Sequence, residues 1–152
     1  NASWKQWMRS AVEAEAEGLY IHGGLTDYWY ANRMLDRFEE AHALMRQWNK
    51  TAGIAAHRCD VHEWVRDNLE PDFHMCSYYN PTDRSTAPQH RNTGERWRDS
   101  DRDAMVAVIR TLKVPAVNGL PWAGAGSTGR SPCAARAASR RSCASSAKRP
   151  LG

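Results

Sequence analysis

The sequence lacks a long apolar segment. Its longest purely apolar run ends at Ile109 and falls far short of the roughly 20 residues that a membrane-spanning helix needs. The chain does not open on a charged, then apolar, then small-residue segment, so no signal peptide is expected. Residue 1 is Asn1 rather than an initiator methionine, so the sequence leaves open a targeting segment ahead of it. With 41% hydrophobic and 25% charged residues, the composition is typical of a soluble globular protein.

Cysteine is also scarce. The chain has four cysteines, of which Cys59 and Cys76 lie in the first 117 residues and Cys133 and Cys143 lie beyond them. Four cysteines spread this widely do not form the framework of a disulfide-rich secreted domain. The cysteine content therefore favours the cytoplasm or another reducing compartment.

Acidic residues are absent from residues 118–152, which hold six of the 21 basic residues of the chain. Residues 1–117 carry the other 15 basic residues and all 17 acidic ones, so the basic character belongs to the C-terminal part. That part consists mostly of alanine, arginine, serine, glycine and proline, a composition that does not bury a core. We therefore predict a folded domain over residues 1–117 and a low-complexity, disordered basic tail over residues 118–152.

Helical periodicity is the strongest pattern in the first 117 residues. Apolar residues recur at spacings of three and four over residues 4–12, 31–48, 54–69 and 105–112, as on the buried face of a helix. Residues 71–98 interrupt the pattern with prolines, Asn80, Asp83 and Gly94. We found no alternating pattern typical of strands. The sequence therefore predicts an all-α fold: a small bundle of three to four helices with a long polar loop.

Aromatic residues are the most prominent candidates for an interface. Three consecutive aromatics, Tyr28-Trp29-Tyr30, cannot all face inward from one helix, and the pair Tyr78-Tyr79 lies in the polar loop. Tryptophan and tyrosine are enriched at binding hot spots. Because no complete catalytic constellation is visible, we expect a non-catalytic interaction module. Its anchors would be Trp29, Tyr30, Tyr78 and Tyr79, and its partner another protein or a second copy of the chain.

A first alternative is binding to nucleic acid. The polar loop ends in an arginine-rich segment that contains Arg91, Arg96, Trp97 and Arg98, and arginine beside an aromatic ring can hold phosphate and stack a base. The basic tail could add a salt-dependent attraction to polyanions. No recognised nucleic-acid-binding motif accompanies these residues.

A second alternative is a zinc-stabilised domain. Cys59 and His62 are three residues apart and would share one face of a helix, and His74 and Cys76 follow after a turn. Two thiolates and two imidazoles form a familiar tetrahedral zinc set. The spacing differs from the recognised zinc-finger patterns, so zinc stays an alternative and no cofactor is assigned.

One glycine-rich segment, Gly124 to Ser131, resembles the phosphate-binding loop of P-loop nucleotide hydrolases, with Arg130 where the family has lysine. A strand should precede that loop, but Pro115 and Pro121 occupy the preceding stretch. Arginine also differs from lysine in shape and reach. We therefore do not expect ATP binding at this segment.

Overall fold

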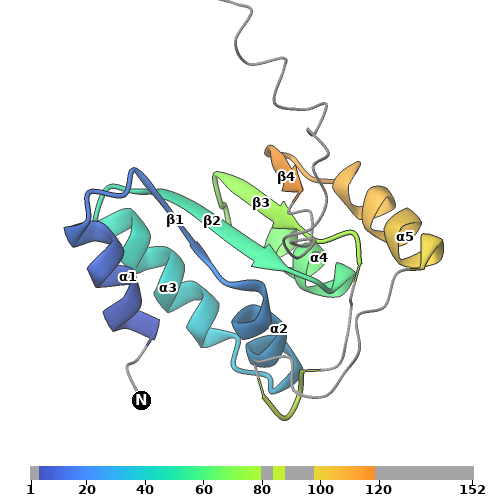
Figure 1. Ribbon diagram of the computed structural model, residues 1–152, viewed down its shortest axis with the longest axis horizontal. Helices are drawn as coiled ribbons and strands as arrows, with labels where there is room; N and C mark the ends of the chain where they lie inside the picture. The colour runs from blue at the N-terminus through green and yellow to red at the C-terminus, as the bar shows by residue number, and fades with distance from the viewer. Residues whose placement is uncertain (1–3, 80–83, 88–97, 119–152) are drawn as a thin grey trace, which may run out of the picture. The chain divides into compact units, whose positions relative to one another are not determined.

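The computed structural model describes residues 4–79, 84–87 and 98–118, which form an α/β fold with a four-stranded sheet (Figure 1). The described elements, in chain order, are α1 (Trp4–Glu13), β1 (Gly18–Ile21), α2 (Gly23–Ala31), α3 (Asp36–Gln47), β2 (Thr51–Ala56), α4 (Cys59–Asn68), β3 (Phe73–Cys76), α5 (Asp99–Ile109) and β4 (Ala116–Asn118). The tail predicted over residues 118–152 lies, apart from Asn118, outside the described residues.

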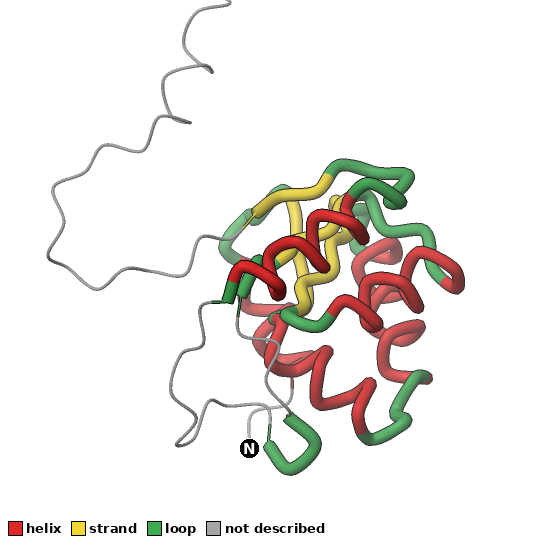
Figure 2. The backbone as a smooth tube through the Cα atoms, turned by 90° about the vertical axis from the view of Figure 1, so that its right-hand side faces the viewer, coloured by secondary structure: helices red, strands yellow, loops and turns green. Residues whose placement is uncertain are grey.

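The four strands are parallel and lie side by side in chain order, β1-β2-β3-β4. One row of paired residues crosses the whole sheet through Ile21, Ile54, His74 and Ala116. Each crossover steps the same way along the sheet, and crossovers between parallel strands are almost always right-handed. Helices α1 to α4 pack on one face of the sheet, the face that carries Ile21 and Ile54, and Figure 2 shows helices to one side of the strands.

The main core lies between that face of the sheet and the helices. Trp29 of α2 is 3% exposed and makes edge-to-face contacts with Trp4 and Phe38, at centroid distances of 5.4 and 5.6 Å. The other buried members of this core are Met8, Leu19, Ile21, Ala41, Met45, Ala52, Ile54, Ala56, Val61 and Val65. Burying a side chain of valine or leucine size contributes about 1.5–3 kcal/mol, so this core is the main source of stability.

The predicted all-α helical bundle is wrong, because a parallel sheet lies at the centre of the described fold. The helix expected over residues 31–48 is preceded by a separate helix, α2, and a turn divides the two. At that turn Arg33 takes a positive φ of 58°, which an α-helix does not allow. The expected helix over residues 54–69 begins as strand β2, and only α4 is helical. The expected polar loop over residues 71–98 contains strand β3.

Two properties of the strands explain the error. Strand β2 is buried at every position from Ala52 to Ala56, so it shows no alternation of apolar and polar residues. It also consists mostly of alanine and glycine, which have low strand propensity. Strands β1, β3 and β4 are only three or four residues long, too short for a period of two to stand out.

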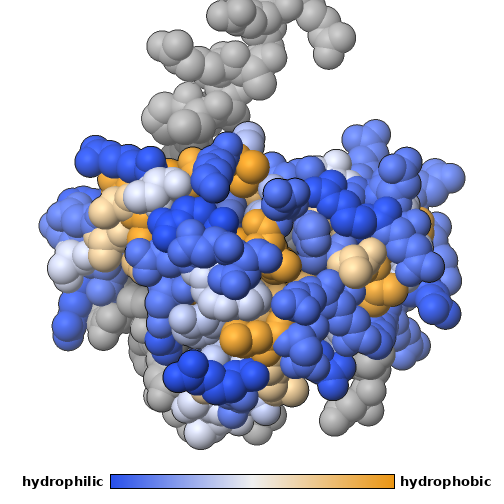
Figure 3. Space-filling model, turned by 180° about the vertical axis from the view of Figure 1, so that it is seen from behind, coloured by the Kyte–Doolittle hydropathy of each residue, from blue (hydrophilic) through white to orange (hydrophobic). Residues whose placement is uncertain are grey.

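The outer surface of the helices is polar where it meets solvent. On the face shown in Figure 3, apolar side chains form only small groups among hydrophilic ones. Within the described part of the chain, no helix combines the length and the apolar character needed to cross a membrane.

Candidate functional site

Parallel strands end at the same edge of a sheet, and ligands of open α/β proteins bind beyond that carboxyl edge. In this chain His22 follows β1, His57 follows β2 and Tyr78 lies just after β3, while Asn118 ends β4. The Asn118 side chain donates a hydrogen bond to the Tyr78 hydroxyl at 2.8 Å, which ties the last two of these positions together. We call this group of residues the carboxyl-edge site.

A buried carboxylate, Asp27 of α2, lies next to His57 at the carboxyl-edge site. Its side chain is fully buried, and it accepts the ring Nδ1–H of His57 at 2.9 Å and the guanidinium of Arg84 at 2.8 Å. It also accepts the backbone N–H groups of His57 and Arg58 at 3.2–3.4 Å. The Asp27 carboxylate therefore fixes both the main chain and the ring at the end of β2.

Burial also affects Arg84, the ion-pair partner of the Asp27 carboxylate. Arg84 is nearly fully buried, and loss of hydration lowers the pKa of its guanidinium, an effect that the charge of Asp27 opposes. A buried ion pair is costly to form unless further hydrogen bonds compensate for lost hydration, and the backbone bonds to Asp27 supply them. The Asp27–Arg84 ion pair is therefore buried beneath the carboxyl edge, with hydrogen bonds that offset its lost hydration.

Thr26 and Gly23, both in α2, allow this helix to lie close to the end of β2 and to the His57 ring. The hydroxyl of the fully buried Thr26 lies 2.9 Å from the carbonyl oxygen of Gly23 and also contacts the carbonyl oxygen of Ala55, at the end of β2. A side chain at position 23 would bring its Cβ within 2.9 Å of Nδ1 and Cε1 of His57. Only glycine therefore lets α2 approach the ring this closely.

His22 forms the N-cap of α2. Its Nδ1 accepts the backbone N–H of Gly24 at 3.2 Å, so in the neutral ring the proton is carried by Nε2. Burial lowers the pKa of His22, and the neighbouring His57 and Arg84 add to that effect while Asp27 opposes it. His22 is therefore neutral at pH 7.

Next to His57, Arg58 and Asp60 form a two-pronged ion pair at the start of α4. Arg58 Nε lies 2.9 Å from one carboxylate oxygen of Asp60, and the guanidinium also contacts the other oxygen. This hydrogen bond is the main reason that the pKa of Asp60 is lowered. The pair contributes no net charge to the site.

A second histidine pair lies inside the fold, between α4 and β3. His62 Nε2 donates to the carbonyl oxygen of Ala56 at 3.2 Å, so its Nδ1 accepts the Nδ1–H of His74 at 3.0 Å. Both rings are buried, and burial lowers the pKa of each to about 4; the neighbouring His62 is a second cause for His74. The pair is neutral at pH 7 and belongs to the core.

Two of the four candidate zinc ligands form this histidine pair, and the other two are cysteines on the same two elements. His62 and His74 touch, Cys59 begins α4, and Cys76 follows His74 on the same face of β3. Burial raises the pKa of Cys76 to about 12 and also raises that of Cys59, which keeps both thiols protonated. Within residues 4–79, 84–87 and 98–118, no three histidine, cysteine, aspartate or glutamate side chains are grouped so as to hold a metal ion.

The residues proposed for other interfaces are scattered. Trp29 is a core residue and not an exposed anchor, because α2 packs it against Trp4 and Phe38. Tyr30 is half-buried, as are Tyr78 and Tyr79, whose rings meet edge to face at 6.5 Å. Arg98 forms the N-cap of α5. The remaining proposed residues, which are Arg91, Arg96, Trp97 and the segment from Gly124 to Ser131, lie outside the described residues.

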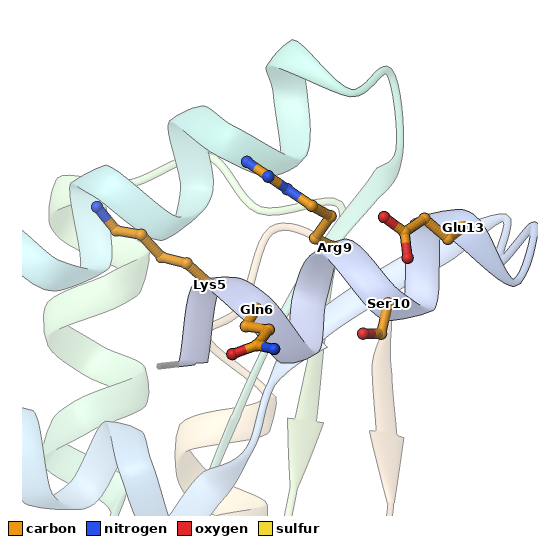
Figure 4. Close-up of a pocket in the computed structure, with 5 residues that line it drawn as sticks. All are labelled: Lys5, Gln6, Arg9, Ser10 and Glu13. Atoms are coloured by element: carbon orange, nitrogen blue, oxygen red, sulfur yellow. The ribbon is translucent and has the colours of Figure 1, made fainter. Parts of the chain in front are cut away.

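Two surface hollows lie away from the carboxyl edge. One is lined by a single side of α1, from which side chains such as Lys5 and Arg9 project (Figure 4). The other lies where α4 ends and β3 and β4 begin, and is lined by residues such as Arg66 and Lys113.

Comparison of the chain with protein-family models, with curated proteins and with solved structures finds no match.

Proposed function

We propose that the chain binds a small polar molecule at the carboxyl-edge site. The observation that carries the proposal is the fully buried Asp27 carboxylate, which orients His57 at the end of a central strand. A structural role alone does not require an ionised group there, since buried ion pairs are often no more stabilising than apolar residues of similar volume. Perturbed and buried ionisable groups cluster at functional sites.

The groups at this edge define the kind of ligand. The side chains of His22, Tyr78 and Asn118 at this edge are polar, and 18% of the His57 side chain is exposed. The charged pairs Arg58–Asp60 and Arg84–Asp27 cancel. A site that is polar and close to neutral suits an uncharged or singly charged small molecule better than a polyanion.

A titration followed by two-dimensional NMR of the ¹⁵N-labelled chain tests this proposal. The probes are hydroxyacetone, pyruvate and inorganic phosphate, each at millimolar concentration. We expect hydroxyacetone or pyruvate to shift the backbone amides of His22, His57 and Asn118, and not those of α1. His57→Gln should abolish the shifts. The matched control is His42→Gln, which changes a histidine on α3 whose ring lies beside the Glu70 carbonyl oxygen.

Two results would contradict the proposal. If none of the three probes shifts any amide signal, the proposed ligand binding is refuted. If the shifts persist in His57→Gln, the probe binds at another place.

A second candidate function is self-association, which keeps the interaction role expected from the sequence. The face of the sheet opposite the helices carries Tyr20, Phe73, Met75 and Val117. Tyr20 is 45% exposed and Val117 46% exposed, although parallel sheets are normally covered on both faces. We infer that a second copy covers this face, because identical apolar faces pair readily about a two-fold axis.

Light scattering coupled to size-exclusion chromatography tests self-association. We expect the unmodified chain to elute as a dimer and Val117→Lys to elute as a monomer. The control is Trp7→Lys, which changes a 65% exposed residue on α1 and should leave the dimer intact. A monomeric unmodified chain would contradict this second function.

A further inference from the structure

We infer that the hollow between the end of α4 and the starts of β3 and β4 binds a free amino acid with a small aliphatic side chain. We call it the amino-edge hollow, because it lies at the opposite end of the strands from the carboxyl-edge site. The ammonium group of the ligand donates to His74 Nε2, and its carboxylate contacts Lys113. This binding does not depend on the carboxyl-edge site.

The amino-edge hollow has the size of a small-molecule site. Its volume is about 430 Å³, and ligand pockets occupy about 300–1,000 Å³. Its walls are the last turn of α4, the connection into β3 and the residues before β4. The backbone N–H of His74 donates to the carbonyl oxygen of Pro115 at 3.0 Å, and Arg66 of α4 donates to the Thr111 hydroxyl at 2.7 Å. Hydrogen bonds therefore join all three walls.

His74 brings a nearly buried ring nitrogen to this hollow. The residue is 1% exposed, yet it is one of those that line the hollow. Its Nδ1 lies 3.0 Å from His62 Nδ1 inside the fold, and among the described residues its Nε2 has no hydrogen-bond partner. Nε2 is also not one of the described side-chain nitrogens that are fully enclosed without a partner. It therefore keeps a small exposed area, and the opening beside it is the amino-edge hollow.

The directions of the hydrogen bonds make this nitrogen an acceptor. The carbonyl oxygen of Ala56 can only accept, so His62 Nε2 carries a proton and the neutral His62 ring accepts through Nδ1. His74 must then donate through Nδ1, which leaves a lone pair on its Nε2. Burial keeps both rings neutral by lowering the pKa of each to about 4. A ligand in the hollow must therefore donate a hydrogen bond to His74.

The charges around the hollow favour a ligand with one charge of each sign. Arg66 and Asp67 form a two-pronged ion pair, so their charges cancel. Glu70 and Lys113 also line the hollow, and the side chain of neither forms a hydrogen bond or ion pair with another described residue. The pKa of Asp67 is lowered mainly by its hydrogen bond with Arg66 and further by the charge of Lys113. Lys113 is therefore within electrostatic reach of this wall.

The end of α4 decides which group of the ligand meets His74. The C-terminal end of a helix carries a partial negative charge and attracts cations. Helix α4 ends at Asn68, and the residues that follow lead directly to His74. An ammonium group supplies both the N–H donor and the positive charge at this end, which leaves Lys113 for a carboxylate. The partly buried Leu69 and Val114 add apolar surface for a small aliphatic side chain.

Binding of L-valine and of two fragments of this amino acid tests the inference. The ¹⁵N-labelled full chain is titrated with L-valine, with 3-methylbutanoate, which lacks the ammonium group, and with isobutylamine, which lacks the carboxylate. We expect L-valine to shift the backbone amides of His74 and Lys113 in two-dimensional NMR spectra. Each fragment should bind at least about tenfold more weakly, the effect of one hydrogen bond to a charged group. A fragment that binds as tightly as L-valine would refute the contact assigned to the missing group.

Two variants test the two contacts one at a time. His74→Asn keeps a donor towards His62 but removes the acceptor Nε2, and should weaken L-valine binding about tenfold. Lys113→Gln removes an exposed charge and should weaken it about two- to fivefold. The matched control is Lys50→Gln, which changes a lysine just before β2 that does not line the hollow and should leave the affinity unchanged. If His74→Asn does not fold, the fragments and Lys113→Gln still decide.

The ¹⁵N signal of the His74 ring gives a readout that a purely structural role would not move. Donation by the ammonium group should shift the Nε2 signal upfield when L-valine is added, while the ring signals of His42 stay in place. Absence of amide shifts with L-valine, or amide shifts without movement of the His74 Nε2 signal, would overturn the inference. Either result leaves the carboxyl-edge proposal standing, and failure of that proposal leaves this inference standing.

Discussion

Mild acid should destabilise this fold through the buried pair of His62 and His74. Burial lowers the pKa of both to about 4, below the unfolded value of about 6.5. Between these values the unfolded chain binds protons that the native chain excludes, so the free energy of unfolding falls as the pH falls. This stability is fully present above about pH 6.5 and is lost progressively towards pH 4.

The size of the loss follows from the shift. Each pH unit below the unfolded pKa costs about 1.36 kcal/mol for each excluded proton. At about pH 5 each histidine therefore loses roughly 2 kcal/mol, and the pair roughly 4 kcal/mol, relative to about pH 7.5. Stability of a domain of this size is typically 5–15 kcal/mol, so the loss is a large fraction of the total.

Urea unfolding followed by tryptophan fluorescence measures this difference. His74→Asn keeps a side-chain N–H that can donate to His62 Nδ1 but removes one titrating ring, so its loss between about pH 7.5 and pH 5 should be about half as large. His22 contributes in the same direction and equally in both proteins. His42→Gln is the control. An equal loss in His74→Asn and the unmodified chain would refute the reasoning.

Three further predictions concern the contacts that hold the sheet and α2 in place. Gly53→Ala would place a Cβ 2.2 Å from the Phe73 ring and should cost about 1–3 kcal/mol in urea unfolding, whereas Gly18→Ala, with 3.3 Å of room, should cost less. Asp72→Asn weakens an acceptor of a β2 amide at 2.7 Å and should cost about 1 kcal/mol; an unchanged midpoint would contradict this. Thr26→Val leaves two carbonyl oxygens without the hydroxyl and should lower thermal stability by roughly 1–3 kcal/mol.

Helices α1, α3 and α5 were largely predictable, because each has a polar outer side and an apolar inner side. The periodic patterns over residues 4–12 and 105–112 coincide closely with α1 and α5, and the later part of 31–48 with α3. The ends of the helices were harder to predict. Helices α1 and α3 are followed by residues of positive φ, Glu15 at 62° and Asn49 at 53°, and only asparagine is a usual signal for that conformation.

The sheet escaped prediction because its strands lack the patterns by which strands are recognised. Gly53 resembled a helix break and instead lies mid-strand, where the ring of Phe73 covers it. Gly18 resembled a helix stop and instead begins β1. In a parallel sheet covered by helices, the sequence of the central strand is a continuous run of small or apolar residues. A buried helix of similar composition has the same sequence pattern.

Of the carboxyl-edge site only Tyr78 was among the predicted binding residues, since the members of the site become neighbours only when the strands are aligned. Asp27 bonds to His57, which lies 30 positions later in the sequence, and to Arg84, which lies 57 positions later. A local signal nevertheless existed: short apolar runs end at His22 and His57. A histidine directly after such a run lies at the carboxyl end of the strand, the edge that ligands of open α/β sheets reach. The strands therefore define the edge and the edge defines the site, so the site cannot be recognised before the strands are.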